Sequence, residues 1–570
     1  MKNAEIAEVF ERIADILEIQ GEGVFRVNAY RRAARIIEDL SSDVADLVES
    51  GEILDIKGIG KGTADGVAEY LETGTMRRYE EAKKSIPKGL SELLYVPGLG
   101  PKTIGLLWRE LDVKSIKSLK RALRGKKILD LPGIGPKKVE NIQAGLRVYE
   151  SRSGRLTLGT VLPAALATVR ELKEATGIDD IEVAGSIRRW RETIGDIDIL
   201  ALSAKPAPVI EAFTTLPRVT EVLAAGSTKA SVRVADGLQI DLRVVPPASY
   251  GAALNYFTGS QAHNVALRGL AQQKGLKLSE YGLFKGDRRV AGRTEESIYK
   301  RLGMDYVEPE LREDRGEVEA ALEHDLPELV ELKDIRGDLH SHSDYSDGHA
   351  TIEEMARAAK AMGYGYLLMS DHSHSLGIAH GLSVERLQQQ AEEISEVNKK
   401  VKNFTVLRGT EVDILSDGSL DFPDEVLEEL DVVVASIHSG FQQSRDKITG
   451  RIVSAIENHN VDVIGHPTGR LLGTRPAYDV DMEAVMSAAA EHRTALEINA
   501  HYERLDLNDV NSRRAAEMGI KVAISTDSHH PDQLWHMELG VRTARRGWLT
   551  RSDVLNTMTS KALLKYLSSR

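Results

Sequence analysis

The sequence predicts a multidomain protein with a helical N-terminal region, an α+β middle region and a C-terminal α/β barrel. Three observations carry this prediction. A short glycine-containing pattern occurs three times before residue 140, aspartates interrupt apolar runs between residues 196 and 241, and fourteen of the sixteen histidines lie after residue 336. The chain has 570 residues, which is too long for one core, and a typical domain of ~150 residues gives about three or four domains.

The composition is that of a water-soluble protein, with 42% hydrophobic and 28% charged residues. No apolar run approaches the ~18 residues that span a bilayer, and the N-terminal MKNAEIAEVF is an amphipathic helix start and not a signal peptide. The chain has no cysteine, which excludes disulfides and thiolate zinc sites. These features favour an intracellular enzyme.

Positive charge is concentrated in residues 101–147, although the whole chain has a formal net charge of −13. This window holds twelve lysines and arginines against four acidic residues. Such a basic surface by itself indicates a solvated helical face. If the same segment also offers backbone N–H groups that can bind phosphate, it favours a nucleic-acid partner.

A repeated sequence pattern predicts such phosphate-binding backbone N–H groups. Its copies are ILDIKGIGKG (53–62), LLYVPGLGPK (93–102) and ILDLPGIGPK (128–137). The glycines permit a tight turn, and the first N–H groups of the following helix can donate to a phosphate oxygen. The pattern resembles the helix-hairpin-helix of DNA repair and replication proteins, which binds DNA without base preference. The residues expected to contact DNA in these hairpins are Gly58, Gly60, Lys61, Gly98, Gly100, Lys102, Gly133, Gly135 and Lys137.

Three aspartates of the middle region lie on expected strands. Asp196 and Asp198 are separated by one residue in the segment 181–202, and Asp241 is at the centre of LQIDLRVV (238–245). Side chains of a strand alternate between its faces, so Asp196 and Asp198 point to the same side. Three acids on neighbouring strands would hold two magnesium ions about 4 Å apart, which suits nucleotidyl transfer. The alternative is that Asp196 and Asp198 are ordinary acids on an exposed strand face and bind no metal ion.

The loop before these aspartates contains Gly185-Ser186, followed by Arg188 and Arg189. It resembles the nucleotidyltransferase superfamily, in which a Gly-Ser pair and a nearby arginine hold the triphosphate. The resemblance implies this role for Gly185, Ser186 and Arg189.

The segment YFTGSQAHNVALR (256–268) resembles the dNTP-binding segment of family X DNA polymerases. The resemblance implies a sugar pocket lined by Tyr256 and Phe257 and a close approach at Gly259. It also implies that Asn264 contacts the nascent base pair and that Arg268 contacts the template strand.

The N-terminal FRVNAYRRAARIIEDL (25–40) resembles the small DNA-end-binding domain of the same family. This implies that Arg26 and Tyr30 contact the 5′ end of a gap. One position departs from the family pattern, because Gly66 stands where members with deoxyribose-phosphate lyase activity carry a Schiff-base lysine. We therefore expect weak or absent lyase activity. The family X resemblance covers residues 1–317.

After Arg336, apolar β-like runs alternate with amphipathic helices, which implies parallel strands and, with about seven units, a closed TIM-like barrel. Active sites of such barrels lie at the C-terminal ends of the strands. Six of the seven runs end in His or Glu, and the remaining run ends at Asn499: RGDLH, YLLMSDH, FTVLRGTE, VVVASIH, VDVIGH, ALEIN and VAISTDSH.

These strand ends resemble the PHP (polymerase and histidinol phosphatase) family, whose barrels bind up to three metal ions. The resemblance implies Mn²⁺ or Zn²⁺, a bridging Glu411 and phosphoester hydrolysis, since a metal ion lowers the pKa of bound water toward ~7. We expect the barrel's other histidines to be solvated or to support ligands, and His374 and His501 are the first candidates for an exception because each falls beside a strand end. The nine implied metal positions are His340, His342, Asp347, His372, Glu411, His438, His466, Asp527 and His529.

The predicted domains follow one another in six segments. They are a DNA-end-binding helical domain (1–85), a second helix-hairpin-helix subdomain (86–150), a nucleotidyltransferase palm (151–245), a nascent-base-pair and thumb subdomain (246–309), a charged helical linker (310–336) and a PHP phosphoesterase barrel of the (β/α)7 type (337–570).

The sequence thus predicts a bacterial or archaeal family X DNA polymerase that fills short gaps in DNA repair, using Mg²⁺ or Mn²⁺ in the palm. The barrel would add a 3′–5′ exonuclease and could also cut at abasic sites. We expect gapped or nicked double-stranded DNA and dNTPs as partners, no membrane, a monomer, and a nucleoid-associated place in the cytoplasm. Two alternatives stay open: a DNA-end phosphoesterase with a vestigial palm, and a non-catalytic DNA-end scaffold.

Overall fold

The computed structural model describes residues 3–38, 44–56, 58–73, 75–94, 96, 99–152, 155–234 and 238–569. Its contacts divide the chain into two compact units, of which unit 1 is Met1–Gly154 and unit 2 is Arg155–Arg570. None of the helices within the described ranges is long and apolar enough to cross a membrane. The finer domain boundaries expected inside each unit stay predictions.

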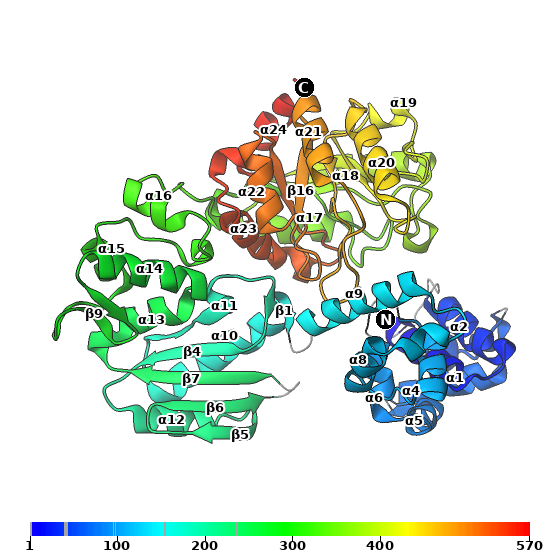
Figure 1. Cartoon of the computed structure of the whole chain (residues 1–570). Coiled ribbons are helices and arrows are strands. Elements are labelled where there is room, and N and C mark those ends of the chain that lie inside the picture. The colour runs from blue at the N-terminus through cyan, green and yellow to red at the C-terminus, as the bar shows by residue number, and fades with distance from the viewer. Residues whose placement is uncertain are drawn as a thin grey trace. The chain divides into compact units, whose positions relative to one another are not determined.

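Unit 1 is helical, as expected (Figure 1). Its first helix belongs to two apolar cores, because Phe10 packs against residues 53–76 while Ile19 packs with Leu90 and Leu107. The second contact is close, since a Cβ at Gly105 would lie 2.3 Å from the carbonyl oxygen of Ile19. The helices are α1 (Asn3–Gln20), α2 (Val24–Glu38), α3 (Val44–Glu49), α4 (Lys61–Thr73), α5 (Arg77–Lys84), α6 (Lys88–Leu93), α7 (Pro101–Leu111), α8 (Ile116–Arg124) and α9 (Pro136–Arg152).

Unit 2 begins with a five-stranded mixed sheet in the order β2-β4-β7-β6-β5. Strands β4 and β7 are parallel, and the other neighbours are antiparallel. Helices α10 (Leu158–Thr176) and α12 (Pro206–Thr214) pack on this sheet (Figure 1). The strands are β2 (Ile181–Val183), β4 (Ile197–Leu202), β5 (Val219–Ala225), β6 (Lys229–Val234) and β7 (Gln239–Val245), and a small pair joins β1 (Leu156–Thr157) to β3 (Thr193–Ile194).

A smaller antiparallel sheet follows, in the order β10-β9-β8. Its helices and strands carry the predicted nucleotide segment and a further apolar core around Leu267, Leu283 and Tyr299. The elements are α13 (Tyr250–Thr258), α14 (Gln261–Gln273), β8 (Lys277–Ser279), β9 (Gly282–Lys285), β10 (Arg288–Ala291) and α15 (Glu295–Leu302).

Residues 310–336 differ from the helical linker expected from their charges. They contain one α-helix, α16 (Glu317–Glu323), and short 3-10 helices at Pro309–Leu311 and Leu332–Asp334. Glu310, Arg312 and Glu317 are at most 2% exposed. Each charge is met by a residue far away in the sequence or in another element: Arg545 donates to Glu310 at 2.8 Å, Arg312 donates to Glu295 at 2.5 Å, and His263 lies 2.6 Å from Glu317. These three charged side chains are therefore part of the interior of unit 2, whereas other residues of the segment, such as Leu332, are exposed.

Glu295 joins two guanidinium groups in this interior, and its replacement by glutamine is expected to destabilise unit 2. Its carboxylate accepts hydrogen bonds from Arg188 at 2.7 Å and from Arg312 at 2.5 Å. Burial alone would raise the pKa of this carboxyl, but the two arginines lower it to about 2. Glu295→Gln leaves the buried Arg312 without its carboxylate, so we expect a loss of about 3–5 kcal/mol in the free energy of unfolding by urea denaturation.

The dependence of the free energy of unfolding on acidic pH provides a second test of the role of Glu295. A carboxyl whose pKa is lowered by folding stabilises the protein above its ordinary pKa near 4.5, and this stabilisation is lost as the pH falls toward about 2. The wild type should lose this stabilisation between pH ~4.5 and pH ~2, whereas Glu295→Gln, which lacks the carboxylate, should not. Glu296→Gln, at the exposed neighbouring position, is the control and should behave as wild type. An unchanged unfolding midpoint in Glu295→Gln would contradict the assigned role.

The C-terminal part of unit 2 is a sheet of seven parallel strands in sequence order. Beyond the first and last strands, Ser341 pairs with Ser528 in parallel, which nearly closes the sheet into a barrel. The predicted (β/α)7 barrel is thereby confirmed. The strands are β11 (Gly337–Asp338), β12 (Tyr366–Met369), β13 (Thr405–Asp413), β14 (Val432–Ser436), β15 (Val463–Ile464), β16 (Ala495–Asn499) and β17 (Val522–Ser525).

Helices surround these strands (Figure 1), and apolar side chains fill one end of the barrel. Leu368, Leu407 and Val434 pack there against Leu563 of the last helix. The histidines and acids follow the strands at the opposite end. The helices are α17 (Ile352–Ala361), α18 (Val384–Lys400), α19 (Asp424–Leu427), α20 (Arg445–Glu457), α21 (Met482–His492), α22 (Asp509–Glu517), α23 (Met537–Arg546) and α24 (Ser560–Leu567).

Candidate active sites

The three predicted palm aspartates lie together on the five-stranded sheet. Asp198 on β4 is the register partner of Asp241 on the parallel strand β7, and Asp196 directly precedes β4. Burial and the negative charges of Asp196 and Asp241 raise the pKa of Asp198 to about 6. Like-charged oxygen ligands in this arrangement fit divalent cations, which would relieve their repulsion and favour the ionised carboxylates.

Lys229 also contacts this cluster, which the sequence alone did not indicate. Its Nζ atom lies 3.2 Å from Asp241 Oδ2, and Gln239 donates a hydrogen bond to Oδ1 at 3.0 Å. Burial raises the pKa of Asp241, but the hydrogen bonds from Ser231, Gln239 and Lys229 outweigh burial and leave it lowered. Asp241 is thus held ionised by its neighbours.

Gly185 allows the Gly185-Ser186 loop to approach the aspartates closely. It begins the short helix α11 (Gly185–Arg188), has φ +60°, and a Cβ built on it would lie 2.4 Å from Asp198 Oδ2. Ser186 follows it in the same turn. Arg189 of this loop is engaged by residues that follow the five-stranded sheet, because it donates to Glu313 at 3.0 Å and to the carbonyl oxygen of Thr258 at 2.5 Å.

Gly185→Ala is therefore expected to impair nucleotide incorporation. The added methyl group would displace Asp198, and a misplacement of about 1 Å at a reacting centre lowers turnover by about 100-fold. Steady-state incorporation into a gapped primer measures this effect. Gly177→Ala is the matched control, because Gly177 has φ +67° with nothing within 4 Å of the added Cβ. Equal incorporation by the two variants would show that the close approach at Gly185 is unimportant.

The nucleotide segment places its predicted residues around the end of α13. The Tyr256 and Phe257 rings lie 5.2 Å apart at an angle of 85°, and Asn264 donates to the carbonyl oxygens of Tyr256 at 2.8 Å and Gly259 at 3.1 Å. Arg268 lies one helical turn beyond Asn264 and donates to its carbonyl oxygen at 3.1 Å. The segment is thus a pre-formed turn stabilised by its own polar groups.

The three hairpins of unit 1 share one backbone hydrogen bond in their described residues. In each, the N–H of the apolar residue between the glycines donates to the carbonyl three residues earlier: Ile59 to Ile56 at 3.0 Å, Leu99 to Val96 at 3.0 Å and Ile134 to Leu131 at 3.1 Å. A Cβ at Gly60, Gly100 or Gly135 would have nothing within 4 Å, so the backbone there is open to a ligand. Lys61, Lys102 and Lys137 lie in the first turns of α4, α7 and α9. Gly98 lies outside the described residues, and Gly58 and Gly133 have φ +106° and +77°.

Arg26 and Tyr30 line a cavity of about 570 Å³ in unit 1, together with Gly60 and Arg78. Arg78 donates a hydrogen bond to the Tyr30 hydroxyl at 3.2 Å. Gly66 faces the core on α4, where a Cβ would be 3.4 Å from Met76 and 3.5 Å from Phe10. Weak or absent lyase activity stays a prediction.

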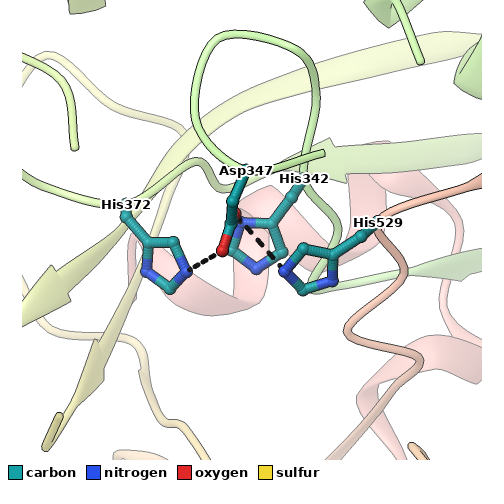
Figure 2. Close-up of side chains that lie close together, drawn as sticks. All are labelled: His342, Asp347, His372 and His529. Atoms are coloured by element: carbon teal, nitrogen blue, oxygen red, sulfur yellow. Dashed lines mark ion pairs between the residues drawn. The ribbon is translucent and has the colours of Figure 1, made fainter. Parts of the chain in front are cut away.

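The nine predicted metal positions of the barrel converge at the C-terminal ends of the strands. Figure 2 shows one group, in which Asp347 lies 3.5 Å from His372 and 3.3 Å from His529, with His342 beside them. The ligand atoms within each group all lie within 4.8 Å of one another, and the three groups are His342-Asp347-His372-His529, His340-His342-Asp527 and His372-Glu411-His438.

Glu411 lies at the centre of these groups. Its carboxylate oxygens are 2.9 to 3.3 Å from four histidine nitrogens: His340 Nε2, His372 Nδ1, His438 Nε2 and His466 Nε2. Burial would raise the pKa of this carboxyl, but the surrounding histidines hold it well below its ordinary value. An acid in contact with so many imidazoles is suited to bridge metal ions.

Several buried imidazole nitrogens have no hydrogen-bond partner in the part of the chain that the structure describes. Both ring nitrogens of His342 and Nε2 of His340 are among them. Buried polar atoms are normally paired, so orphaned nitrogens that face carboxylates fit a bound metal ion. Imidazole and carboxylate together suit Mn²⁺, Fe²⁺ and Zn²⁺.

Acids that orient the ligands were missed by the sequence reasoning. Glu497 is fully buried on β16, accepts from the backbone N–H of His466 at 2.5 Å and lies 2.8 Å from His340 Nδ1. Asp413 accepts from the backbone N–H of His438 at 3.2 Å. The only sequence signal for Glu497 is its place as an acid inside the apolar run ALEIN, of which the strand-end pattern singles out only Asn499.

The other barrel histidines lie outside the three metal groups. His501 and His536 contact each other at 5.1 Å between ring centres. His374 is exposed and belongs to none of the three groups, and the histidines at 349, 380, 459 and 492 are also exposed, whereas His530 is half-buried.

The chain matches four family models. They are a helix-hairpin-helix domain (residues 1–76), a SAM-like helix-hairpin-helix tandem (90–147), the DNA polymerase beta thumb (253–313) and the PHP domain (338–501). The DNA polymerase/3'-5' exonuclease PolX of Bacillus subtilis (strain 168) is 39% identical over 572 residues, which cover 100% of this chain and 99% of that protein. The chain belongs to the PolX family of DNA polymerases.

PolX membership confirms the resemblance to family X polymerases with a C-terminal PHP domain. The barrel by itself is similar to smaller proteins. A probable phosphatase of Thermoanaerobacter sp. (strain X514) is 33% identical over 246 residues, covering 41% of this chain and 94% of that protein. A probable phosphatase of Aliivibrio fischeri (strain MJ11) is 31% identical over 207 residues, covering 34% and 78%.

Proposed function

We propose that this protein is a DNA polymerase that fills short gaps by template-directed nucleotide addition and trims 3′ ends in its barrel. The proposal is supported by two clusters of potential metal ligands in one chain: three aspartates on the five-stranded sheet, and nine histidine, aspartate and glutamate side chains at the strand ends of the barrel. The PolX relative, which matches over the full chain, is named for both activities.

In the palm, Asp196, Asp198 and Asp241 would hold Mg²⁺ or Mn²⁺. When bound, such ions lower the pKa of a primer 3′-hydroxyl and neutralise the triphosphate and pyrophosphate charge. The parallel pairing of β4 and β7 fixes the separation of Asp198 and Asp241. Gly185 and Ser186 present the triphosphate loop beside them, while Tyr256, Phe257 and Asn264 receive the sugar and the base.

In the barrel, the nine ligands would hold up to three Mn²⁺ or Zn²⁺ ions. Bound ions supply an activated water and polarise the phosphate. Glu411 and Asp347 position the histidines around them, and Glu497 orients His340 and His466. The same chemistry would permit cleavage at an abasic site.

The hairpins of unit 1 would hold the phosphate backbone of gapped or nicked double-stranded DNA, and Arg26 and Tyr30 would contact the 5′ end. Neutral peptide donors and nearby lysines give no base preference. Incoming dNTPs, a monomeric state and a nucleoid-associated place in the cytoplasm complete the proposal.

A gapped duplex with a 5′-labelled primer tests the proposal directly. The protein is incubated with Mg²⁺ or Mn²⁺, with and without dNTPs, and the primer length is read on a denaturing gel. We expect extension to the end of the gap with dNTPs and shortening without them. Shortening alone would favour a phosphoesterase with a vestigial palm, and binding without any change of length would favour a scaffold.

A further inference from the structure

Arg504 lies beside the metal groups of the barrel, although it is none of the nine ligands. Its Nε atom is 3.4 Å from Asp527 Oδ2, and the other oxygen of that carboxylate is 3.2 Å from His342 Nε2. The side chain of Arg504 is 17% exposed. Its guanidinium is therefore largely removed from water at the edge of the site.

One nitrogen of this guanidinium has no partner. Arg504 Nη1 is buried and makes no hydrogen bond to any described residue. A buried donor without a partner is energetically unfavourable, and more so when it is charged, so such a group in a native structure calls for a ligand. The ligand must accept hydrogen bonds from a cation.

A second guanidinium adds positive charge to the same region. Arg475 lies 4.2 Å over the Phe441 ring and donates to the carbonyl oxygen of Gly469 at 3.0 Å, and it forms no ion pair within the described residues. Burial and the nearby charge of Arg504 both lower its pKa, which indicates that the two guanidinium groups repel one another. An anion between them would relieve that repulsion.

The backbone of Arg504 is held rigidly in place. Its N–H donates to the carbonyl oxygen of His501 at 2.7 Å, and its carbonyl oxygen accepts from Arg470 Nε at 2.9 Å. Arg470 in turn binds Glu192 of the palm at 2.7 Å, and Leu505 is buried in the apolar core of the palm. The guanidinium is thus positioned before any substrate arrives, as electrostatic catalysis requires.

We propose that Arg504 is a substrate-contacting residue of the trimming reaction, with Nη1 donating to a non-bridging oxygen of the scissile phosphodiester. In that reaction water oxygen bonds to phosphorus, the bond from phosphorus to the 3′-oxygen of the preceding nucleotide breaks, and that oxygen takes a proton. Negative charge grows on the non-bridging oxygens, where a planar guanidinium stabilises it. The inference rests on the proposed 3′ trimming activity.

The test uses the full-length Arg504→Met and Arg504→Lys variants with Mn²⁺. Arg514→Met is the control, because Arg514 pairs with the exposed Glu483 on the outside of the barrel. For Arg504→Met we expect kcat/KM for trimming to fall by about 100- to 1,000-fold and the inhibition constant of dAMP, a product analogue, to rise. For Arg504→Lys we expect kcat/KM for trimming to fall by about tenfold, since lysine keeps the positive charge but lacks the planar guanidinium. Bound metal, measured by elemental analysis, and dNTP incorporation should stay at the wild-type level.

Two results would overturn the inference. One is trimming by Arg504→Met within about threefold of wild type. The other is a loss of trimming in step with a loss of bound metal, which would make Arg504 a support for Asp527. Incorporation by the same protein reports whether the variant is folded. If the wild type itself does not trim, the proposed exonuclease function fails, and that outcome is distinct from either result.

Discussion

Asp198→Asn is expected to abolish nucleotide incorporation while 3′ trimming continues. The change is nearly isosteric, but it removes the negative charge at the centre of the palm cluster, where Asp198 pairs in register with Asp241. Without this carboxylate the two remaining aspartates would not hold both of the proposed metal ions. We expect incorporation to fall by at least about 1,000-fold, equal to about 4 kcal/mol of lost transition-state stabilisation.

Single-turnover extension of a gapped primer measures the loss. Asp179→Asn is the control, because Asp179 is exposed at the approach to the same sheet and should leave both activities unchanged. Residual extension by Asp198→Asn near the wild-type rate would place the polymerase chemistry elsewhere. Parallel loss of trimming would show that the variant disturbs unit 2 as a whole.

Glu411→Gln is expected to have the opposite effect, removing trimming and preserving incorporation. Glu411 is in contact with four histidines of the barrel, and an amide keeps its size without the negative charge that would bridge the proposed metal ions. We expect trimming to fall by at least about 1,000-fold and bound metal to decrease.

Elemental analysis of the purified variant and trimming of a labelled primer with Mn²⁺ check this expectation. Glu425→Gln, on the exposed surface of α19, serves as the matched control and should retain metal and activity. Normal metal content combined with full trimming would contradict a bridging role for Glu411.

Much of the barrel could be predicted from the sequence because its ligands follow strand ends directly. His340, Glu411 and His438 each terminate an apolar run, and parallel strands bring such ends to one edge. The aspartates of the palm were predictable for a related reason, since the alternation of a strand places Asp196 and Asp198 on one face.

Other contacts could not be predicted, because they join residues far apart in the sequence without a local pattern. Glu497 reaches His340 across 157 positions, and Arg470 reaches Glu192 across 278. The same reason explains the error over residues 310–336. Their charges resembled a solvated linker, but partners such as Arg545, 235 positions from Glu310, allow those charges to be buried.

Two independent metal sites in one chain are proposed to make and to break the same kind of phosphodiester bond. The most direct measurement is a gel of a 5′-labelled gapped primer with Mn²⁺ and dNTPs present or absent, comparing wild type, Asp198→Asn and Glu411→Gln. We predict that Asp198→Asn only shortens the primer and that Glu411→Gln only extends it. Two independent sites would be contradicted if either variant lost both extension and shortening. They would also be contradicted if both variants kept both activities.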